Sequence, residues 1–200
     1  MPVGRFRTLL PLFNELRGER VLVRPYRLED AEAVQEAVAE SREHIRPWLP
    51  FFDQHQTVEE SRDWITRVMA SWLLREDLVT SLWDVATGRY VGGSGLHPRG
   101  YPTSWEVGAF EIGYWVRKSA EGCGYVTEAV KLQTDYAFAS LGANRVFIRC
   151  DARNTRSAAV PERLGFVREA LLRNDALAND GTIRSTLVYA LIPSDPRWAR

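Results

Sequence analysis

The segment that most constrains the fold joins an alternating apolar run, two glycines and an amphipathic run. The run WEVGAFEIGYWV (residues 105–116) alternates apolar and polar side chains, which predicts a strand. Gly122 and Gly124 follow it, and Gly142 stands where a later helix would end. Between them, apolar residues recur at helical spacing, namely Val126, Ala129, Val130, Ala137 and Leu141. The chain must therefore bring a strand, a tight turn and a helix N-terminus to one point.

The two glycines suit the binding of an anion at this helix N-terminus. The first N–H groups of a helix have no partner inside it, and they lie at the positive end of the helix dipole. Phosphate and pyrophosphate groups bind at such ends. A side chain at Gly122 or Gly124 would keep an anion away from the backbone, and glycine also tolerates a positive φ. Because glycines before helices are common, a purely structural turn is the alternative interpretation of these residues alone.

Other phosphate-binding and nucleophile motifs are incomplete in this sequence. Thr127 stands where G-x-G-x-x-G requires its third glycine, and no G-x-x-x-x-G-K-[ST] occurs. This disfavours a dinucleotide-binding fold and a P-loop ATPase. The segment GGSGL ends on Leu96, where a nucleophile elbow requires glycine, so a serine hydrolase is not supported there.

The rest of the chain alternates between strand and helix patterns. Thr57, with Glu60 three residues later, predicts the N-terminus of one helix. Further helices are expected at residues 28–43 and 154–165, and strands at 20–26, 78–85, 90–97, 144–151, 166–173 and 182–191. This order predicts a mixed sheet flanked by helices.

Composition narrows the class of protein. The 200 residues show no break in composition, which predicts one domain, and 26 basic side chains balance 26 acidic ones. That balance removes the general argument for a nucleic acid or an anionic membrane as partner. Cys123 and Cys150 are too few for a disulfide framework, and without a Cys/His cluster no metal site is expected. Reduced thiols fit a cytoplasmic location, and no apolar stretch approaches the ~20 residues of a membrane span.

Four segments together resemble the GCN5-related N-acetyltransferases (GNAT), specifically their RimJ/RimL-type group. They are VLVRPYRLED, EIGYWVRKSAEGCGYVTEAV, LGANRVFIRCDARNTRSAAVPERLGF and GTIRSTLVYAL. The likeness runs from about Arg20 to Leu191 and predicts an N-terminal extension (1–19), one acetyltransferase domain (20–192) and a C-terminal tail (193–200). It implies an α/β (α+β) fold whose mixed, mostly antiparallel sheet is flanked by helices, with a splayed strand pair that holds CoA.

The resemblance also implies where acetyl-CoA and the acceptor amine bind. The pyrophosphate is expected on the loop formed by Glu121, Gly122, Cys123, Gly124, Tyr125 and Val126. The pantetheine arm is expected along the backbone of Trp115, Val116 and Arg117, because a strand edge offers unmet N–H and C=O groups. Asn154 matches a family asparagine near the cofactor. The segment EHIRPWLPF resembles part of the acceptor side, which gives Arg46, Trp48 and Phe51 as substrate-binding candidates, with Phe52 beside them.

Three residues depart from the family pattern. The family loop usually opens with Arg or Gln and has Gly or Ala at its sixth position, where this chain has Glu121 and Val126. A carboxylate beside a pyrophosphate repels it unless the carboxylate points into solvent. Pro161 stands inside the helix that begins at Asn154 and crowds the carbonyl of Ser157, which predicts a kink or a short helix there.

The candidate catalytic residues are Glu111 and Ser157. Glu111 shares a strand face with Gly113 and Trp115 and would act as the base on the amine, with an ion-pair role and Glu106 as alternatives. Ser157 resembles the RimL-type serine that protonates the leaving thiolate, although a serine in a first helical turn can equally satisfy local backbone.

Other polar and aromatic residues have simpler interpretations. Tyr114 and Tyr136 are alternative acids, with core packing favoured for both, as it is for the helix residues Trp64 and Trp72. Cys123 near a helix N-terminus is interpreted as a loop residue, because direct transfer needs no nucleophile. The histidines are isolated in sequence, which favours surface or hydrogen-bonded roles, and they are His44, His55 and His97.

The predicted function is transfer of an acetyl group from acetyl-CoA to a primary amine. The expected acceptor is a protein N-terminal α-amine, of the ribosomal-protein type in this subgroup, by direct attack in a ternary complex. The alternatives are a CoA-binding module of the same fold, transfer of succinyl near Arg46 or Arg117, and a small-amine acceptor. A homodimer is a further expectation.

Overall fold

One eight-stranded sheet forms the centre of the molecule. The computed structural model describes residues 7–49, 55–99, 104–196 and 198. In order across the sheet, the strands are β1 (Leu16–Arg17), β2 (Val21–Pro25), β3 (Leu78–Asp84), β4 (Tyr90–Pro98), β5 (Ala109–Val116), β6 (Arg145–Asp151), β8 (Ile183–Leu191) and β7 (Val167–Leu177). Neighbouring strands are antiparallel except β5 and β6, which are parallel. The predicted mixed, mostly antiparallel sheet is confirmed.

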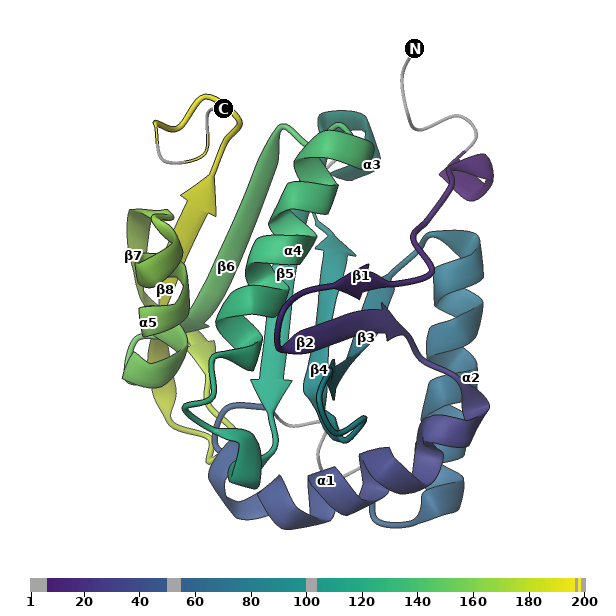
Figure 1. Ribbon diagram of the computed structural model, residues 1–200. Coiled ribbons are helices and arrows are strands. Elements are labelled where there is room, and N and C mark those ends of the chain that lie inside the picture. The colour runs from purple at the N-terminus through teal and green to yellow at the C-terminus, as the bar shows by residue number, and fades with distance from the viewer. Residues whose placement is uncertain (1–6, 50–54, 100–103, 197, 199–200) are drawn as a thin grey trace.

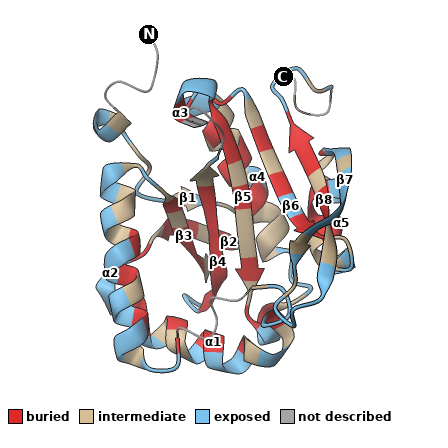
Figure 2. Ribbon diagram, turned by 180° about the vertical axis from the view of Figure 1, so that it is seen from behind, coloured by how far each residue is buried: buried red, intermediate tan, exposed pale blue. Residues whose placement is uncertain are grey.

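Helices flank this sheet on both sides. They are α1 (Ala31–Ile45), α2 (Val58–Leu74), α3 (Ser104–Val107), α4 (Tyr125–Ser140) and α5 (Thr155–Leu164), with short 3-10 turns η1 (Arg7–Leu9), η2 (Leu28–Asp30) and η4 (Lys118–Ala120). Figure 1 shows α4 and α5 in front of the sheet, α1 below it and α2 along its side. Seen from behind in Figure 2, the buried residues concentrate on the central strands.

Apolar side chains fill both sides of the sheet. Phe110 and Ile112 of β5 pack with α4 residues such as Val130. On the opposite side, Trp115 of β5 packs with α1 and α2, and its cluster includes Tyr26, Val34, Val38, Ile65 and Tyr90. Because β5 residues alternate between these two sides, we call the first the α4 face of β5 and the second its α1 face. Trp64 and Trp72 of α2 both pack against the core, as predicted.

The long alternating run differs from its prediction at its start. Residues Ser104–Val107 form the short helix α3, and β5 begins only at Ala109. Gly108 between them has φ +68°, a conformation that breaks the extended backbone. Trp105 is buried instead against Phe110, with ring centroids 5.1 Å apart. The alternation before Gly108 therefore reflects the packing of one helical turn.

Side-chain caps fix the N-termini of two helices. Thr57 Oγ1 accepts from the Glu60 N–H at 3.1 Å and starts α2, as predicted. The Asn154 side chain likewise accepts from the Ser157 N–H at 3.0 Å and starts α5. Gly165 ends α5 in the left-handed conformation.

His55, just before α2, makes folding sensitive to acid. It is 1 % exposed, its Nδ1 lies 3.1 Å from Ser61 Oγ, and burial lowers its pKa from 6.5 to about 4. The unfolded chain therefore binds this proton first, so stability is full above about pH 6.5 and falls as the pH drops toward about 4. From about pH 7.5 to about pH 5.5 we expect a loss of about 1 kcal/mol, measured by urea unfolding. His55→Gln should remove this part of the slope, and an unchanged slope would contradict the assignment.

The described residues contain neither a membrane-spanning helix nor a metal-binding cluster. Within these ranges, none of the helices has the length and apolar character needed to cross a membrane. The same residues contain no group of three or more His, Cys, Asp or Glu side chains placed to hold a metal ion.

Candidate active site

The sheet opens between β5 and β6. These strands pair over three positions only, from Ala109 opposite Arg145 to Glu111 opposite Phe147. Beyond Glu111, the β5 residues Ile112–Val116 pair with β4 on one side, while β6 continues beside β8. Within the described part of the chain, the other edge of Ile112–Val116 has no strand partner. An extended ligand can form backbone hydrogen bonds to such an edge.

The N-terminus of α4 lies just after this opening and presents unpaired donors. Gly122 has φ +76° and Gly124 has φ +83°, so both need the freedom of glycine. Among the residues that the structure describes, no acceptor contacts the backbone N–H groups from Gly122 to Val126. A Cβ built on Gly122 meets nothing within 4 Å. The loop therefore presents unpaired N–H groups and open space at the positive end of a 16-residue helix, an arrangement that suits an anion.

Ion pairs from α1 hold the segment between β5 and this loop. The Arg117 guanidinium, 2 % exposed, lies between Glu36 and Glu40 of α1. Glu40 also accepts from the Ser119 N–H at 2.6 Å. Although burial opposes it, the hydrogen bonds from Arg117 and Ser119 lower the pKa of Glu40 to about 2. The chain thus enters the loop from a fixed position.

The carboxylate of Glu128 fixes α4 from its other side. It accepts from the backbone N–H groups of Glu19, Arg20 and Val21 at 2.6, 3.0 and 3.2 Å. A charge in the first turn of α4 therefore ties the helix to the turn between β1 and β2.

Three residues predicted to contact the cofactor turn their side chains into the protein. Trp115 packs in the α1-face core, Val116 packs against a third apolar cluster, and Arg117 is paired with α1. Only their backbone can serve a ligand in the opening, as the prediction assumed. Because its charge is already compensated, Arg117 does not supply the basic pocket that the succinyl alternative needs.

Glu121 forms ion pairs at the edge of the loop. Its carboxylate lies 2.8 Å from Lys118 Nζ, 2.9 Å from Arg156 Nη1 on α5 and 3.5 Å from His44 Nε2. The hydrogen bond from Lys118 is the largest effect that lowers its pKa. Two cations near the loop are therefore occupied by a neighbouring carboxylate.

Ser157 and Tyr114 meet on the α4 face of the opening. Tyr114 Oη donates to the Ser157 carbonyl at 2.9 Å, and Ser157 Oγ donates to Tyr114 Oη at 3.2 Å. The nitrogen of Pro161 has no hydrogen to donate to that carbonyl. The helix nevertheless continues past Pro161 to Leu164, and it is ten residues long. Burial raises the pKa of the Tyr114 hydroxyl, which keeps it protonated.

Glu111 lies on the α1 face at the last position paired with β6. Its Oε1 and Oε2 accept from Arg149 Nε and Nη2 at 3.0 and 2.9 Å, and Arg99 Nε lies 3.7 Å away. The ion-pair alternative for this residue is therefore realised in the structure. As a base, Glu111 would have to act while Arg149 engages both oxygens. The competing Glu106 lies on α3 and is exposed.

The predicted acceptor segment follows α1. The Arg46 carbonyl accepts a hydrogen bond from Asn179 in the turn between β7 and β8, so this segment lies beside that turn. The Trp48 side chain is exposed. Phe51 and Phe52 lie outside the described residues.

Comparison with known proteins decides the family. The sequence model of the acetyltransferase (GNAT) domain family matches residues 20–167 of this chain. The chain belongs to the GNAT family. It is 30 % identical over 176 residues to YdaF of Bacillus subtilis (strain 168), which carries the provisional name of a ribosomal N-acetyltransferase, and the match covers 88 % of this chain and 92 % of YdaF. The predicted family and the enzyme class, N-acetyltransferase, are confirmed.

Solved structures agree with this assignment. RimJ of Mycobacterium smegmatis, described in complex with a CoA disulfide, is 26 % identical, with a TM-score of 0.75 over 86 % of this chain and 81 % of that one. RimL, a ribosomal alpha-N-protein acetyltransferase in complex with coenzyme A, has a TM-score of 0.78 at 19 % identity, over 89 % and 97 %, and shows the fold alone. As in other members of its family, the cosubstrate of this GNAT is acetyl-CoA.

The structure pairs two residues that sequence reasoning left apart. His97 of β4 lies with its Nδ1 2.6 Å from Oδ1 of Asp77, the residue before β3. The two are twenty positions apart in the chain, so spacing gave no signal. A Cβ built on Gly95 or Gly113 would meet this imidazole at 2.9 or 3.0 Å. Gly95 and Gly113 leave room for the imidazole, but they become neighbours only through the register of β4 and β5, so the sequence alone did not indicate this site.

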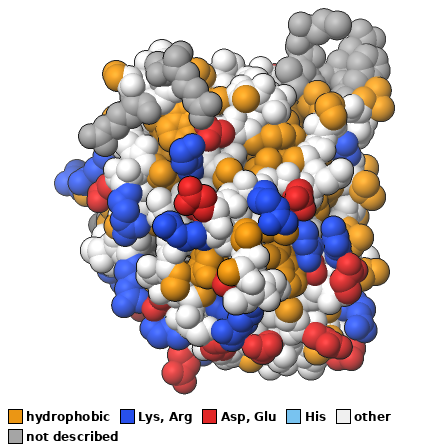
Figure 3. Space-filling model, in the orientation of Figure 1, with side chains coloured by type: hydrophobic (Ala, Val, Ile, Leu, Met, Phe, Trp, Pro, Cys, Tyr) orange, Lys and Arg blue, Asp and Glu red, His pale blue; other side chains and the backbone are white. Residues whose placement is uncertain are grey.

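The remaining candidates lie elsewhere in this GNAT. The Tyr136 hydroxyl donates to the Pro11 carbonyl at 3.3 Å, and its ring packs on Phe13, so it serves the N-terminal segment. Cys123 is exposed in the loop, whereas burial raises the pKa of Cys150 to about 11. Lys, Arg, Asp and Glu side chains are interspersed over the face that carries α4 and α5 (Figure 3).

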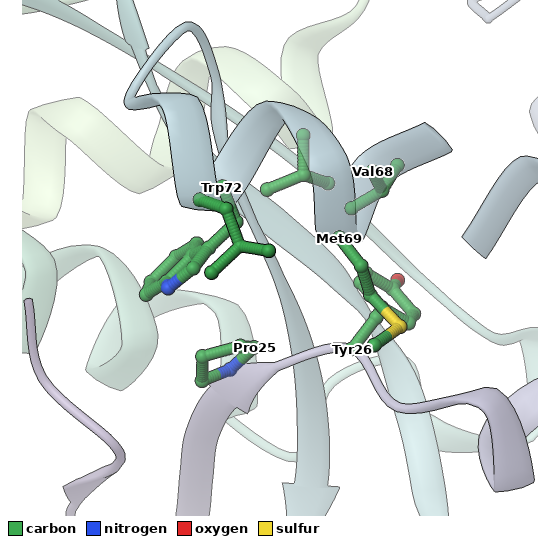
Figure 4. A pocket seen from close by; sticks show the side chains of 7 residues that line it. Pro25, Tyr26, Val68, Met69 and Trp72 are labelled. Carbon is green, nitrogen blue, oxygen red and sulfur yellow. The ribbon is translucent and has the colours of Figure 1, made fainter. Parts of the chain in front are cut away.

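A separate apolar pocket of about 170 Å³ lies between α2 and the β2 and β3 strands (Figure 4). Its lining is Pro25, Tyr26, Val68, Met69, Trp72, Leu73 and Val79. These side chains carry no charge, and none belongs to the opening beside β5. This pocket is therefore separate from the opening beside β5.

Proposed function

We propose that this GNAT transfers the acetyl group of acetyl-CoA to the α-amino group of a protein N-terminus. The observation that carries the proposal is the unpaired β5 edge leading directly to the open N-terminus of α4. The provisional name of YdaF supports a ribosomal-protein acceptor, since the two chains align over most of their lengths.

The loop and the strand edge would each bind a different part of acetyl-CoA. The N–H groups from Gly122 to Val126 would hold the pyrophosphate, because they are unpaired and lie at the positive end of α4. The backbone of Trp115–Arg117 would hold the pantetheine arm as an added strand. The Asn154 side chain caps α5 through Ser157, which supports a role in positioning that serine beside the opening.

Ser157 and Tyr114 are proposed to serve the leaving thiolate. A thiolate leaves readily once it receives a proton, and the two hydroxyl groups lie 3.2 Å apart on the α4 face. Once Ser157 Oγ has given its proton to sulfur, the Tyr114 hydroxyl can turn its hydrogen from the Ser157 carbonyl to Oγ, so the pair can pass one proton to sulfur. Arg46 and Trp48 are proposed to contact the acceptor on the other side.

Mass spectrometry of mixed peptides and small amines after incubation with acetyl-CoA tests the acceptor class. We expect acetylation of peptides at the α-amino group and little at lysine side chains or small amines. Acetylation of a small amine alone, or succinyl-CoA as the better donor, would contradict the proposal.

One alternative is a CoA-binding protein with little turnover, and the ion pairs of Glu121 bear on its affinity for CoA. Lys118 and Arg156 must leave this carboxylate before either can approach a pyrophosphate. Calorimetry with CoA, paired with an assay of acetyl transfer, separates the two functions. Tight binding without transfer to any peptide or amine would support the binding protein.

Glu121→Gln should bind acetyl-CoA more tightly. The substitution removes a negative charge beside the pyrophosphate and releases Lys118 and Arg156, so we expect Kd to fall by roughly threefold to tenfold. Calorimetry at low and high salt measures this, and the gain should shrink as salt rises. Glu32→Gln, an exposed change on α1, is the control. An unchanged Kd would show that this charge does not face the ligand.

A further inference from the structure

The Asp77–His97 pair lies on the α1 face of the opening. His97 is directly opposite Glu111 across the β4–β5 pair, so both side chains stand on the same face. Asp77 flanks His97 from the β3 side, and the side chains of His97 and Asp77 are 20 % and 33 % exposed. The pair is thus accessible from the α1 face of the sheet.

The carboxylate of Asp77 determines which imidazole nitrogen is available. A carboxylate accepts hydrogen bonds, so Nδ1 of a neutral His97 carries the hydrogen at the 2.6 Å contact. Nε2 then holds a lone pair. Among the described residues, Nε2 makes no hydrogen bond, so this lone pair is available to a ligand.

The ring position brings Nε2 to the unpaired edge of β5. Gly95 and Gly113 are paired across β4 and β5, and the imidazole lies over both. A Cβ on Gly113 would lie 3.0 Å from Nε2, and one on Gly95 would lie 2.9 Å from Cε1. Any side chain at either position would push the ring away, so this placement depends on two bare backbone positions.

The groups on the two faces of β5 flank the same point of the opening. Gly113, beneath Nε2, is the second residue of the unpaired stretch that starts at Ile112. The next residue, Tyr114, directs its hydroxyl to Ser157 on the α4 face. A thioester on this edge would therefore have a proton acceptor on one side and a proton donor on the other.

We propose that His97 Nε2 removes a proton from the acceptor ammonium group, with Asp77 as its positioning residue; this rests on the proposed function. The neutral amine nitrogen then forms a bond to the thioester carbonyl carbon, and the carbon–sulfur bond breaks. The second proton of that nitrogen passes to sulfur through Ser157 and Tyr114. The products are the amide, the free thiol of CoA and one proton, which His97 returns to water.

The charged groups around His97 favour it over Glu111 as the base. Asp77 faces it from the β3 side and Glu111 from β5, while Arg99 and Arg149 lie beyond and pair with Glu111. Both Glu111 oxygens are engaged by Arg149, whereas Nε2 has no partner among the described residues. Glu111 would then hold Arg149 at the acceptor side.

The pH dependence of His97→Gln tests this assignment. The probe is the best acceptor among tripeptides that carry each N-terminal residue, assayed by CoA release. At about pH 7 we expect kcat/KM to fall roughly 100-fold or more. At about pH 9.5, an amine with a pKa near ~8 is already neutral, so the loss should shrink to less than about tenfold. The Kd of acetyl-CoA should change by less than about twofold.

Two further variants separate the roles. Asp77→Asn keeps an acceptor for the Nδ1 hydrogen but removes the negative charge. Its kcat/KM should therefore fall roughly tenfold at about pH 7, and this fall should also become smaller at high pH. Glu111→Gln should lower kcat/KM by the same factor at both pH values. The proposal would be overturned if the loss of kcat/KM in His97→Gln were the same at both pH values. It would also be overturned if only Glu111→Gln showed a loss of kcat/KM that becomes smaller as the pH rises.

Nitrogen NMR of the imidazole tests the geometry without any acceptor. Wild-type protein should show His97 with hydrogen on Nδ1, assigned by the signal missing from His97→Gln. Hydrogen on Nε2 would overturn the proposal even if no tripeptide were acetylated. Failure of the wild-type enzyme with every tripeptide, with the Nδ1 form observed, would instead contradict the proposed acceptor class and leave the geometry of the pair supported.

Discussion

Gly122→Val should abolish acetyl-CoA binding at ordinary ligand concentrations. A side chain built there enters open space beside the unpaired N–H groups, which is where a pyrophosphate must approach. We expect Kd to rise by roughly 100-fold or more, equivalent to about 3 kcal/mol. Calorimetry with acetyl-CoA measures the change directly.

Gly142→Val is the matched control for this variant. Gly142 has φ +62°, a Cβ built on it also meets nothing within 4 Å, and it follows the opposite end of α4. Both variants impose the same kind of backbone strain, about 1–2 kcal/mol for a residue with a Cβ in this conformation. Only Gly122→Val should therefore lose binding. Equal losses in both variants, or binding retained in Gly122→Val, would contradict the pyrophosphate site.

Features that are local in the chain could be predicted from the sequence. The Thr57 cap, the glycine pair and the α4 stripe each depend on residues a few positions apart, and the structure contains all three. The order of strands and helices likewise predicted the sheet. The exception was Trp105, where one helical turn happens to alternate like a strand, and only the positive φ of Gly108 separates the two.

Features that depend on distant contacts could not be predicted. Glu111 has the same sequence context whether it is a base or the partner of Arg149, and the two are 38 positions apart. His97 appeared isolated because Asp77 reaches it only across the β3–β4 pair. The sequence predicts that Pro161 weakens α5, because the compensating hydroxyl of Tyr114 comes from β5, 43 positions from Ser157. The roles of these residues, and the domain limits, remain predictions.

The contact between Tyr114 and α5 leads to a prediction about stability. Inside a helix, the Ser157 carbonyl would accept from the N–H four residues later, but that residue is Pro161. The Tyr114 hydroxyl donates to this carbonyl instead, at 2.9 Å. Tyr114→Phe should leave the carbonyl without its donor and destabilise the protein by about 1–3 kcal/mol.

Repeating the change in a Pro161→Ala background tests the cause. Alanine restores an N–H at position 161 that can donate to Ser157, so Tyr114→Phe should cost about 1 kcal/mol less there than in the wild-type background. Urea unfolding of the four proteins gives this coupling energy, with unchanged m-values as the check on two-state behaviour. Equal costs in both backgrounds, within about 0.5 kcal/mol, would show that Tyr114 does not replace the missing helix donor. A positive result would mean that a proline inside α5 helps to hold the Tyr114 hydroxyl beside Ser157, at the opening where the thioester is proposed to lie.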